Sequence, residues 1–100
     1  MKDNEDQLAR LFVNFAKFYR KLETQLIARQ LVIDKLQSQY PQFNFRASLS
    51  TAMTDPQVTG AMEGKFEPAI NRFLADYKTK GAIQAAVEMF GSIAPGYTVQ

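Results

Sequence analysis

The residue types that most often carry out chemistry in proteins are missing from this chain of 100 residues. It contains neither cysteine nor histidine. It therefore lacks a thiolate nucleophile, the commonest general base and the commonest side-chain ligands of transition metals. Carboxylates, lysine and tyrosine could still support catalysis, but no catalytic motif accompanies them. We predict that the protein is not an enzyme and that it has no catalytic residue and no cofactor.

Two acidic residues have a spacing that could bind a metal ion. Glu63 and Glu67 lie four residues apart, and on a helix this spacing brings two carboxylates to one face, where they could hold Mg²⁺ or Ca²⁺. Such ions take about six or more oxygen ligands, so two carboxylates fall short. Lys65 also lies between them. We expect no metal site at this position.

Basic residues accumulate between Gln7 and Lys35, where six basic side chains accompany two acidic ones. A basic helix face can follow a phosphate backbone, so a small nucleic-acid-binding regulator is one alternative function. Its candidate residues are Arg10, Lys17, Arg20, Lys21 and Lys35. However, the aromatic residues Phe18 and Tyr19 belong to an apolar stripe, the formal net charge is only +2, and no nucleic-acid-binding motif is present. A solvated charged face is the favoured interpretation, and nucleic acid is not an expected partner.

Apolar residues recur at helical spacing from residue 3 to about residue 39, a segment without Gly or Pro. Every seventh residue from Phe12 to Tyr40 is aromatic or aliphatic, and a second series lies three or four residues away, as in a coiled coil. We predict a long amphipathic helix over 3–39, ended by Pro41, whose stripe is an oligomer interface. The stripe consists of Leu8, Phe12, Phe15, Tyr19, Leu22, Leu26, Arg29, Ile33 and Leu36.

Arg29 is the one charged residue of this stripe, and two interpretations of it remain open. It could pair with a carboxylate of another helix, with Glu23, Glu63 and Glu67 as candidates, and so fix the register of the helices. Alternatively, its aliphatic stem packs while the guanidinium reaches water. We favour the second interpretation.

The rest of the chain predicts two further helices. We expect a connector over 40–55 that has room for a short helical turn at 47–53. A helix over 56–78, a helix over 80–91 and a tail over 92–100 follow. Asp55 and Pro56 are typical of an N-cap and of the first helical position. Gly60, Gly64 and Pro68 weaken the 56–78 helix, because glycine disfavours helix and proline removes a backbone donor. We therefore expect a kink or a break near 64–68.

The length of the first helix constrains the architecture. A helix over 3–39 spans roughly 54 Å, whereas a compact globule of this chain length has a diameter of roughly 35 Å. We predict a single all-α domain over 1–100, in which the long helix packs against two shorter antiparallel C-terminal helices. Such an elongated hairpin or bundle cannot cover the wide stripe, so we expect oligomerisation to complete it. A homodimer resembling a four-helix bundle is the expected form, and another protein is the alternative partner.

These features favour a non-catalytic helical oligomerisation or protein-interaction module, such as an adaptor, a scaffold or a regulatory subunit. A bundle that binds an apolar ligand is a further alternative, although its candidate residues also have core spacing. These candidates are Met53, Met62, Phe66, Phe73, Met89 and Phe90. No segment approaches the roughly 20 apolar residues of a membrane span, and the N-terminus lacks the order of a signal peptide. We therefore expect a cytoplasmic location.

Overall fold

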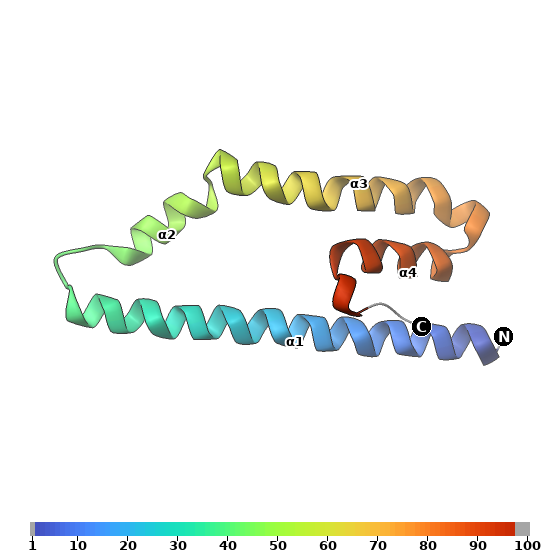
Figure 1. The fold of residues 1–100 in the computed structure, drawn as a ribbon, viewed down its shortest axis with the longest axis horizontal. Coiled ribbons are helices and arrows are strands. Elements are labelled where there is room, and N and C mark those ends of the chain that lie inside the picture. Colours follow the sequence, from blue (N-terminus) through green and yellow to red (C-terminus); the bar gives the residue numbers. More distant parts are fainter. Residues whose placement is uncertain (1, 98–100) are drawn as a thin grey trace.

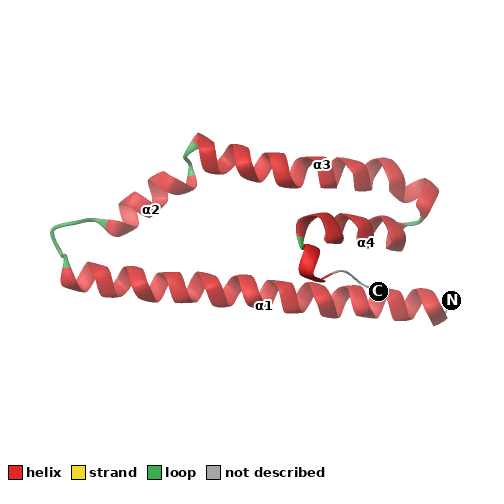
Figure 2. Ribbon diagram, viewed as in Figure 1, coloured by secondary structure: helices red, strands yellow, loops and turns green. Residues whose placement is uncertain are grey.

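The computed structural model describes residues 2–97, and every regular element in that part of the chain is helical (Figure 1 and Figure 2). This confirms the all-α prediction. The elements are α1 (Lys2–Gln39), α2 (Phe45–Met53), α3 (Pro56–Lys80), α4 (Ala82–Ile93) and a short 3-10 turn, η1 (Pro95–Tyr97). The chain runs out along α1, returns through α2 and α3, and then turns back through α4.

The long helix α1 matches its predicted bounds to within one residue and determines the shape of the molecule. It continues for 38 residues because no Gly or Pro interrupts it, and Asp3 and Glu5 lie in its first turn, where the helix dipole favours negative charge. The longest dimension is 59 Å. The radius of gyration is 18.3 Å, against about 13 Å for a compact domain of this length. The molecule is therefore elongated, and we call the outline formed by α1 on one side and by α2 and α3 on the other the frame (Figure 1).

The predicted connector over 40–55 contains a helix of 9 residues, α2, where the sequence suggested a short helical turn. α2 forms because the Asn44 side chain accepts a hydrogen bond from the Ala47 N–H at 3.0 Å and caps the helix. Gln37 of α1 holds the preceding turn. Its amide nitrogen donates to the Phe43 carbonyl at 2.7 Å, and its amide oxygen accepts from the Phe45 N–H at 3.2 Å. Helical spacing alone could not show this capping.

The third helix, α3, begins where the sequence predicts, with the Asp55 side chain accepting from the Gln57 N–H at 2.8 Å and Pro56 in the first turn. The break predicted near 64–68 does not occur, because α3 continues through Pro68 to Lys80. Proline leaves the carbonyl of Gly64 without its helical donor. Gly64 is exposed, so water can take the place of that donor.

The last helix, α4, lies between α1 and α3 over one half of the frame (Figure 1). The predicted helix over 80–91 is displaced to 82–93, because Gly81 ends α3 with a φ of 92° that only glycine adopts easily. The predicted tail is also partly helical, since η1 occupies Pro95–Tyr97. Within the described residues no Cα atom of α3 lies within 8 Å of one of α1. The long helix therefore packs on α4 and α2 instead.

The buried core is small and centred on α4. Among residues 2–97, the buried apolar side chains are Ala69, Ala85, Phe90 and Ala94. The ring of Phe90 lies 6.0 Å from that of Phe15 and 5.8 Å from that of Phe18, distances typical of packed aromatic pairs. Three alanines and one phenylalanine are little for a chain of this length, and most apolar surface remains open.

Candidate interaction surface

The predicted stripe lies along α1 and is mostly exposed. Phe12, Tyr19 and Leu26, which are seven residues apart, are 65%, 58% and 68% exposed. Of the other members, Ile33 and Leu36 are half-buried and the rest are exposed. The structure thus brings the predicted interface residues onto one helix face and leaves that face largely without intramolecular contacts.

A wholly apolar groove lies where the stripe meets α4. It has a volume of about 200 Å³, which is enough for one or two large side chains. Its lining residues are Leu11, Phe12, Phe15, Ala86, Met89, Phe90 and Ile93. Because every lining side chain is apolar, the groove fits an apolar group of a partner better than a charged or polar one. We call it the α1–α4 groove.

A second groove lies further along α1, beyond the reach of α4. It is a shallow hollow on one face of α1, formed by Tyr19, Leu22, Glu23, Gln25, Leu26 and Arg29, and we call it the central groove. Arg29 is exposed, and among the described residues it lies within 4 Å of no carboxylate. The alternative pairing with Glu63 or Glu67, which was not the favoured interpretation, therefore does not form within the described part of one chain.

Sequence analysis missed a further apolar surface on α2 and the first half of α3. Leu49, Met53, Val58 and Met62 are all exposed there. They lie in the half of the molecule that α4 does not reach (Figure 1). Their helical spacing indicated an inward face, but spacing cannot show that no helix of the same chain covers it.

The total exposed area shows how much surface lacks a partner. The chain exposes 7976 Å². A folded monomer of 11.3 kDa exposes about 5,700 Å² by the usual scaling of area with mass. The excess is about 2,200 Å², whereas a standard protein interface buries about 800 Å² on each partner. The excess of total surface is therefore larger than the share that one partner buries in a standard interface.

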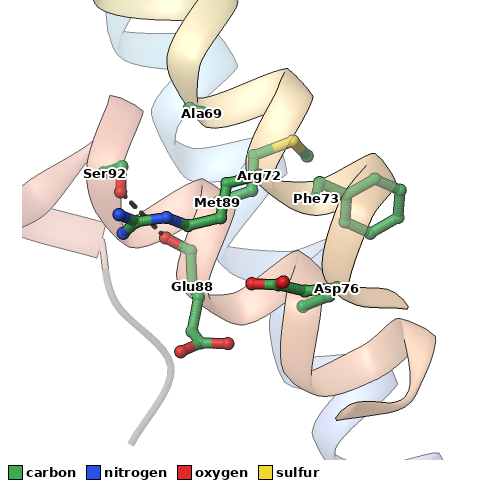
Figure 3. A pocket seen from close by; sticks show the side chains of 8 residues that line it. Ala69, Arg72, Phe73, Asp76, Glu88, Met89 and Ser92 are labelled. Carbon is green, nitrogen blue, oxygen red and sulfur yellow. Dashed lines mark hydrogen bonds between the residues drawn. The ribbon is translucent and has the colours of Figure 1, made fainter. Parts of the chain in front are cut away.

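The seam between α3 and α4, in contrast, is closed. The space between Ala69, Arg72, Phe73, Asp76, Ala85, Glu88, Met89 and Ser92 is about 10 Å³ (Figure 3), which is the room of one water molecule. The six predicted pocket residues do not meet in one cavity. Met89 and Phe90 line the α1–α4 groove, whereas Met53 and Met62 are exposed in the other half of the molecule.

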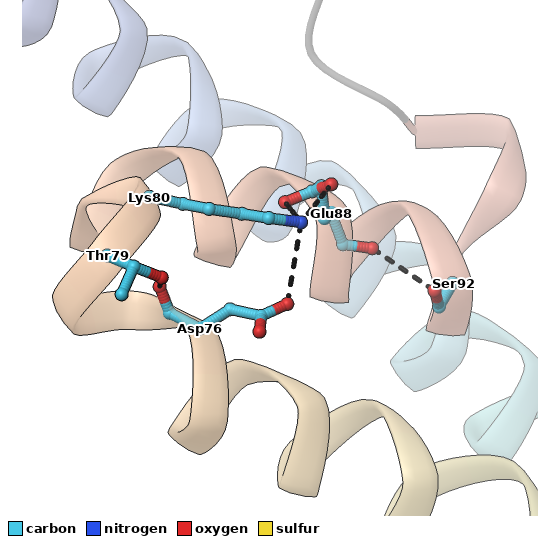
Figure 4. A network of polar contacts seen from close by, with 5 residues as sticks. All are labelled: Asp76, Thr79, Lys80, Glu88 and Ser92. Carbon is cyan, nitrogen blue, oxygen red and sulfur yellow. Dashed lines mark hydrogen bonds and ion pairs between the residues drawn. The ribbon is translucent and has the colours of Figure 1, made fainter.

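A cluster of charged side chains stabilises the turn between α3 and α4 (Figure 4). The Lys80 ammonium lies 3.4 Å from an Asp76 carboxylate oxygen and 3.2 Å from one of Glu88. The hydrogen bond and charge of Glu88, and then the charge of Asp76, raise the pKa of Lys80 above its ordinary value of 10.5. A lysine that stays protonated is neither a base nor a nucleophile. We therefore assign the cluster a structural role, in which it holds the end of α3 against α4.

The residues of the alternative nucleic-acid face are all exposed on α1: Arg10, Lys17, Arg20, Lys21 and Lys35. Their aromatic neighbour Phe18 is half-buried against Phe90 and Tyr97, with ring centroids 5.8 Å and 5.5 Å apart. It is therefore not free to stack on a base. The Lys21 ammonium lies 5.9 Å from the Tyr97 ring.

The other predicted sites have simple positions. Glu63 and Glu67 are exposed on α3. Within residues 2–97 no three acidic residues gather in a way that could hold a metal ion. In the same part of the chain, no helix combines the length and the apolar character that crossing a bilayer requires.

Comparison with known proteins adds no relative. No protein-family model, curated protein or solved structure matches this chain.

Proposed function

We propose that this protein is a non-catalytic helical oligomerisation and interaction module, which assembles as a homodimer through the α1 stripe. The observation that supports this most directly is the exposure of that stripe, together with about 2,200 Å² of surface beyond what a folded monomer of this mass exposes. A run of large exposed apolar side chains along one helix face is typical of interaction sites.

The small size of the buried core also supports the proposal, because it limits the stability of a single folded chain. Ordering a chain costs about 1 to 2 kcal/mol per residue, and the burial of apolar surface is the main term that offsets it. Phe90 is the only large side chain among the buried residues of the described part. A second copy that covers Phe12, Tyr19 and Leu26 would bury the surface that the chain alone leaves open. Folding and association should therefore be coupled.

The solution mass tests the proposal. Light scattering coupled to size exclusion should give twice the chain mass of 11.3 kDa at micromolar concentration. The mass should persist in about 1 M salt, because apolar burial is not screened as ion pairs are. A folded, monodisperse monomer over the same concentration range would overturn the proposal.

A matched pair of variants locates the interface. Leu22→Asp/Leu26→Asp places two charges on the stripe and should give a monomer or an unfolded chain. Ile27→Asp/Leu31→Asp places two charges with the same spacing on another face of α1, at residues that are also exposed, and should leave the dimer mass unchanged. If the second variant also dissociates, the stripe is not the interface.

A further inference from the structure

The cover that α4 gives to α1 ends part-way along the helix. α4 and η1 meet α1 at Leu11, Phe12, Phe15 and Phe18, and the Tyr97 ring lies near Lys21. At the other end α2 meets α1 through Gln37, and Arg46 of α2 lies 3.5 Å from Asp34. Between these regions the stripe residues Leu22 and Leu26 are large, apolar and exposed. The open segment is thus bounded on both sides.

We infer that two copies pair through antiparallel α1 helices, with the two-fold axis at Thr24, so that the open segment of each copy covers that of the other. This inference rests on the proposed homodimer and specifies its orientation and register.

The lining of the central groove supports this register. Its residues lie symmetrically about Thr24 in the sequence: Tyr19 and Arg29, Leu22 and Leu26, Glu23 and Gln25. A two-fold axis at Thr24 therefore superposes the groove on the same groove of the second copy. Leu22 then lies level with the partner's Leu26, and Tyr19 with the partner's Arg29. A self-complementary patch of this kind is what a two-fold interface requires.

The whole stripe follows the same symmetry. Leu8 lies level with the partner's Tyr40, Phe12 with the partner's Leu36, and Phe15 with the partner's Ile33. A shift by one heptad in either direction loses at least one of these layers, because it moves stripe residues beyond the end of the opposite stripe. The register at Thr24 thus buries the largest number of apolar side chains.

The position of Arg29 favours the antiparallel orientation. In a parallel pair in register, the two Arg29 side chains would meet at the seam, and like charges there repel. In the antiparallel pair each guanidinium lies against a Tyr19 ring, and a cation–π contact of this kind is attractive. Tyr19 is 58% exposed, so its ring is free to accept that contact.

The α1–α4 groove supports the same orientation. It is lined by Phe12 and Phe15, which lie level with the partner's Leu36 and Ile33. Its volume of about 200 Å³ suits these two aliphatic side chains. In a parallel pair in register, Phe12 and Phe15 would instead lie level with the same two residues of the partner.

Disulfide crosslinking tests the orientation, and the absence of native cysteine makes single substitutions clean. Leu8→Cys and Tyr40→Cys are the outermost of the paired positions, about 48 Å apart along α1 and the residue that follows it. After mild oxidation, a mixture of the two variants should give a crosslinked dimer, whereas each variant alone should remain uncrosslinked. Val13→Cys mixed with Tyr40→Cys is the control on another face of α1 and should not crosslink.

The outcomes separate the two proposals. Crosslinking of Leu8→Cys with itself indicates a parallel pair and overturns this inference alone. A dimer mass under reducing conditions without crosslinking of the mixture also overturns the inference and leaves the proposed function standing. A monomer mass for folded Leu8→Cys and Tyr40→Cys, and for the native chain, overturns both. Circular dichroism of each variant establishes that the helices are intact.

Discussion

Replacing Leu26 by alanine should weaken the dimer by a calculable amount. Leu26 is 68% exposed in the single chain, and full burial of a leucine is worth about 2 kcal/mol. An interface that covers the remaining two thirds therefore gains roughly 1.5 kcal/mol for each copy, or about 3 kcal/mol for the dimer. A factor of ten corresponds to about 1.4 kcal/mol, so the Kd should rise roughly 100-fold. Alanine keeps the helix intact, because it has the highest helix propensity.

Ile27→Ala is the matched control for this measurement. Ile27 is the adjacent residue, is 63% exposed, and points about 100° away from Leu26 around the helix. Its replacement should change the Kd by less than about twofold, because it lies outside the stripe. Sedimentation equilibrium over a dilution series gives both constants. Equal effects of the two substitutions, or no effect of Leu26→Ala, would refute the assignment of the stripe as the interface.

Three further predictions concern single positions. Arg29→Leu should raise the thermal midpoint of the dimer, because leucine at this stripe position gains more from burial than arginine. It should also allow parallel dimers, which self-crosslinking through Leu8→Cys would detect. Unchanged orientation would show that Arg29 does not select it. Gly81→Ala should lower the free energy of unfolding by about 1 kcal/mol, since the φ of 92° strains any side chain. Gly60→Ala, inside α3 with open space around it, should raise it by up to about 1 kcal/mol. Urea unfolding measures both. Glu88→Gln should remove a pH-dependent contribution to stability. Because the pKa of Lys80 is raised in the folded state, this contribution is fully present below pH 10.5 and is lost as the pH rises through the folded-state pKa. The difference in thermal midpoint between the native chain and the variant should therefore shrink in alkali. A constant difference would contradict the role of Glu88.

The sequence by itself determined the elements whose signals are local. An uninterrupted heptad pattern up to Pro41 is sufficient for α1, because every residue of the segment favours the same helix and the same face. Asp55 and Pro56 mark the start of α3, and Gly81 marks its end, because caps act through neighbouring backbone groups. The same reasoning overestimated Pro68. Local rules assign proline a cost in a helix, but they do not show that the rest of a long helix outweighs it.

Only the tertiary structure determined which apolar helix faces are covered by other helices. α2 depends on bonds from Gln37 of α1 to the turn before it, and such contacts have no signature in sequence periodicity. The apolar face of α3 was expected to meet α1, but α4 lies between them and reaches only half of the frame (Figure 1). A periodic pattern shows that a helix has an apolar face. Whether that face is buried depends on the lengths and turns of all the other helices, which act together in three dimensions and leave the stripe of α1 open here.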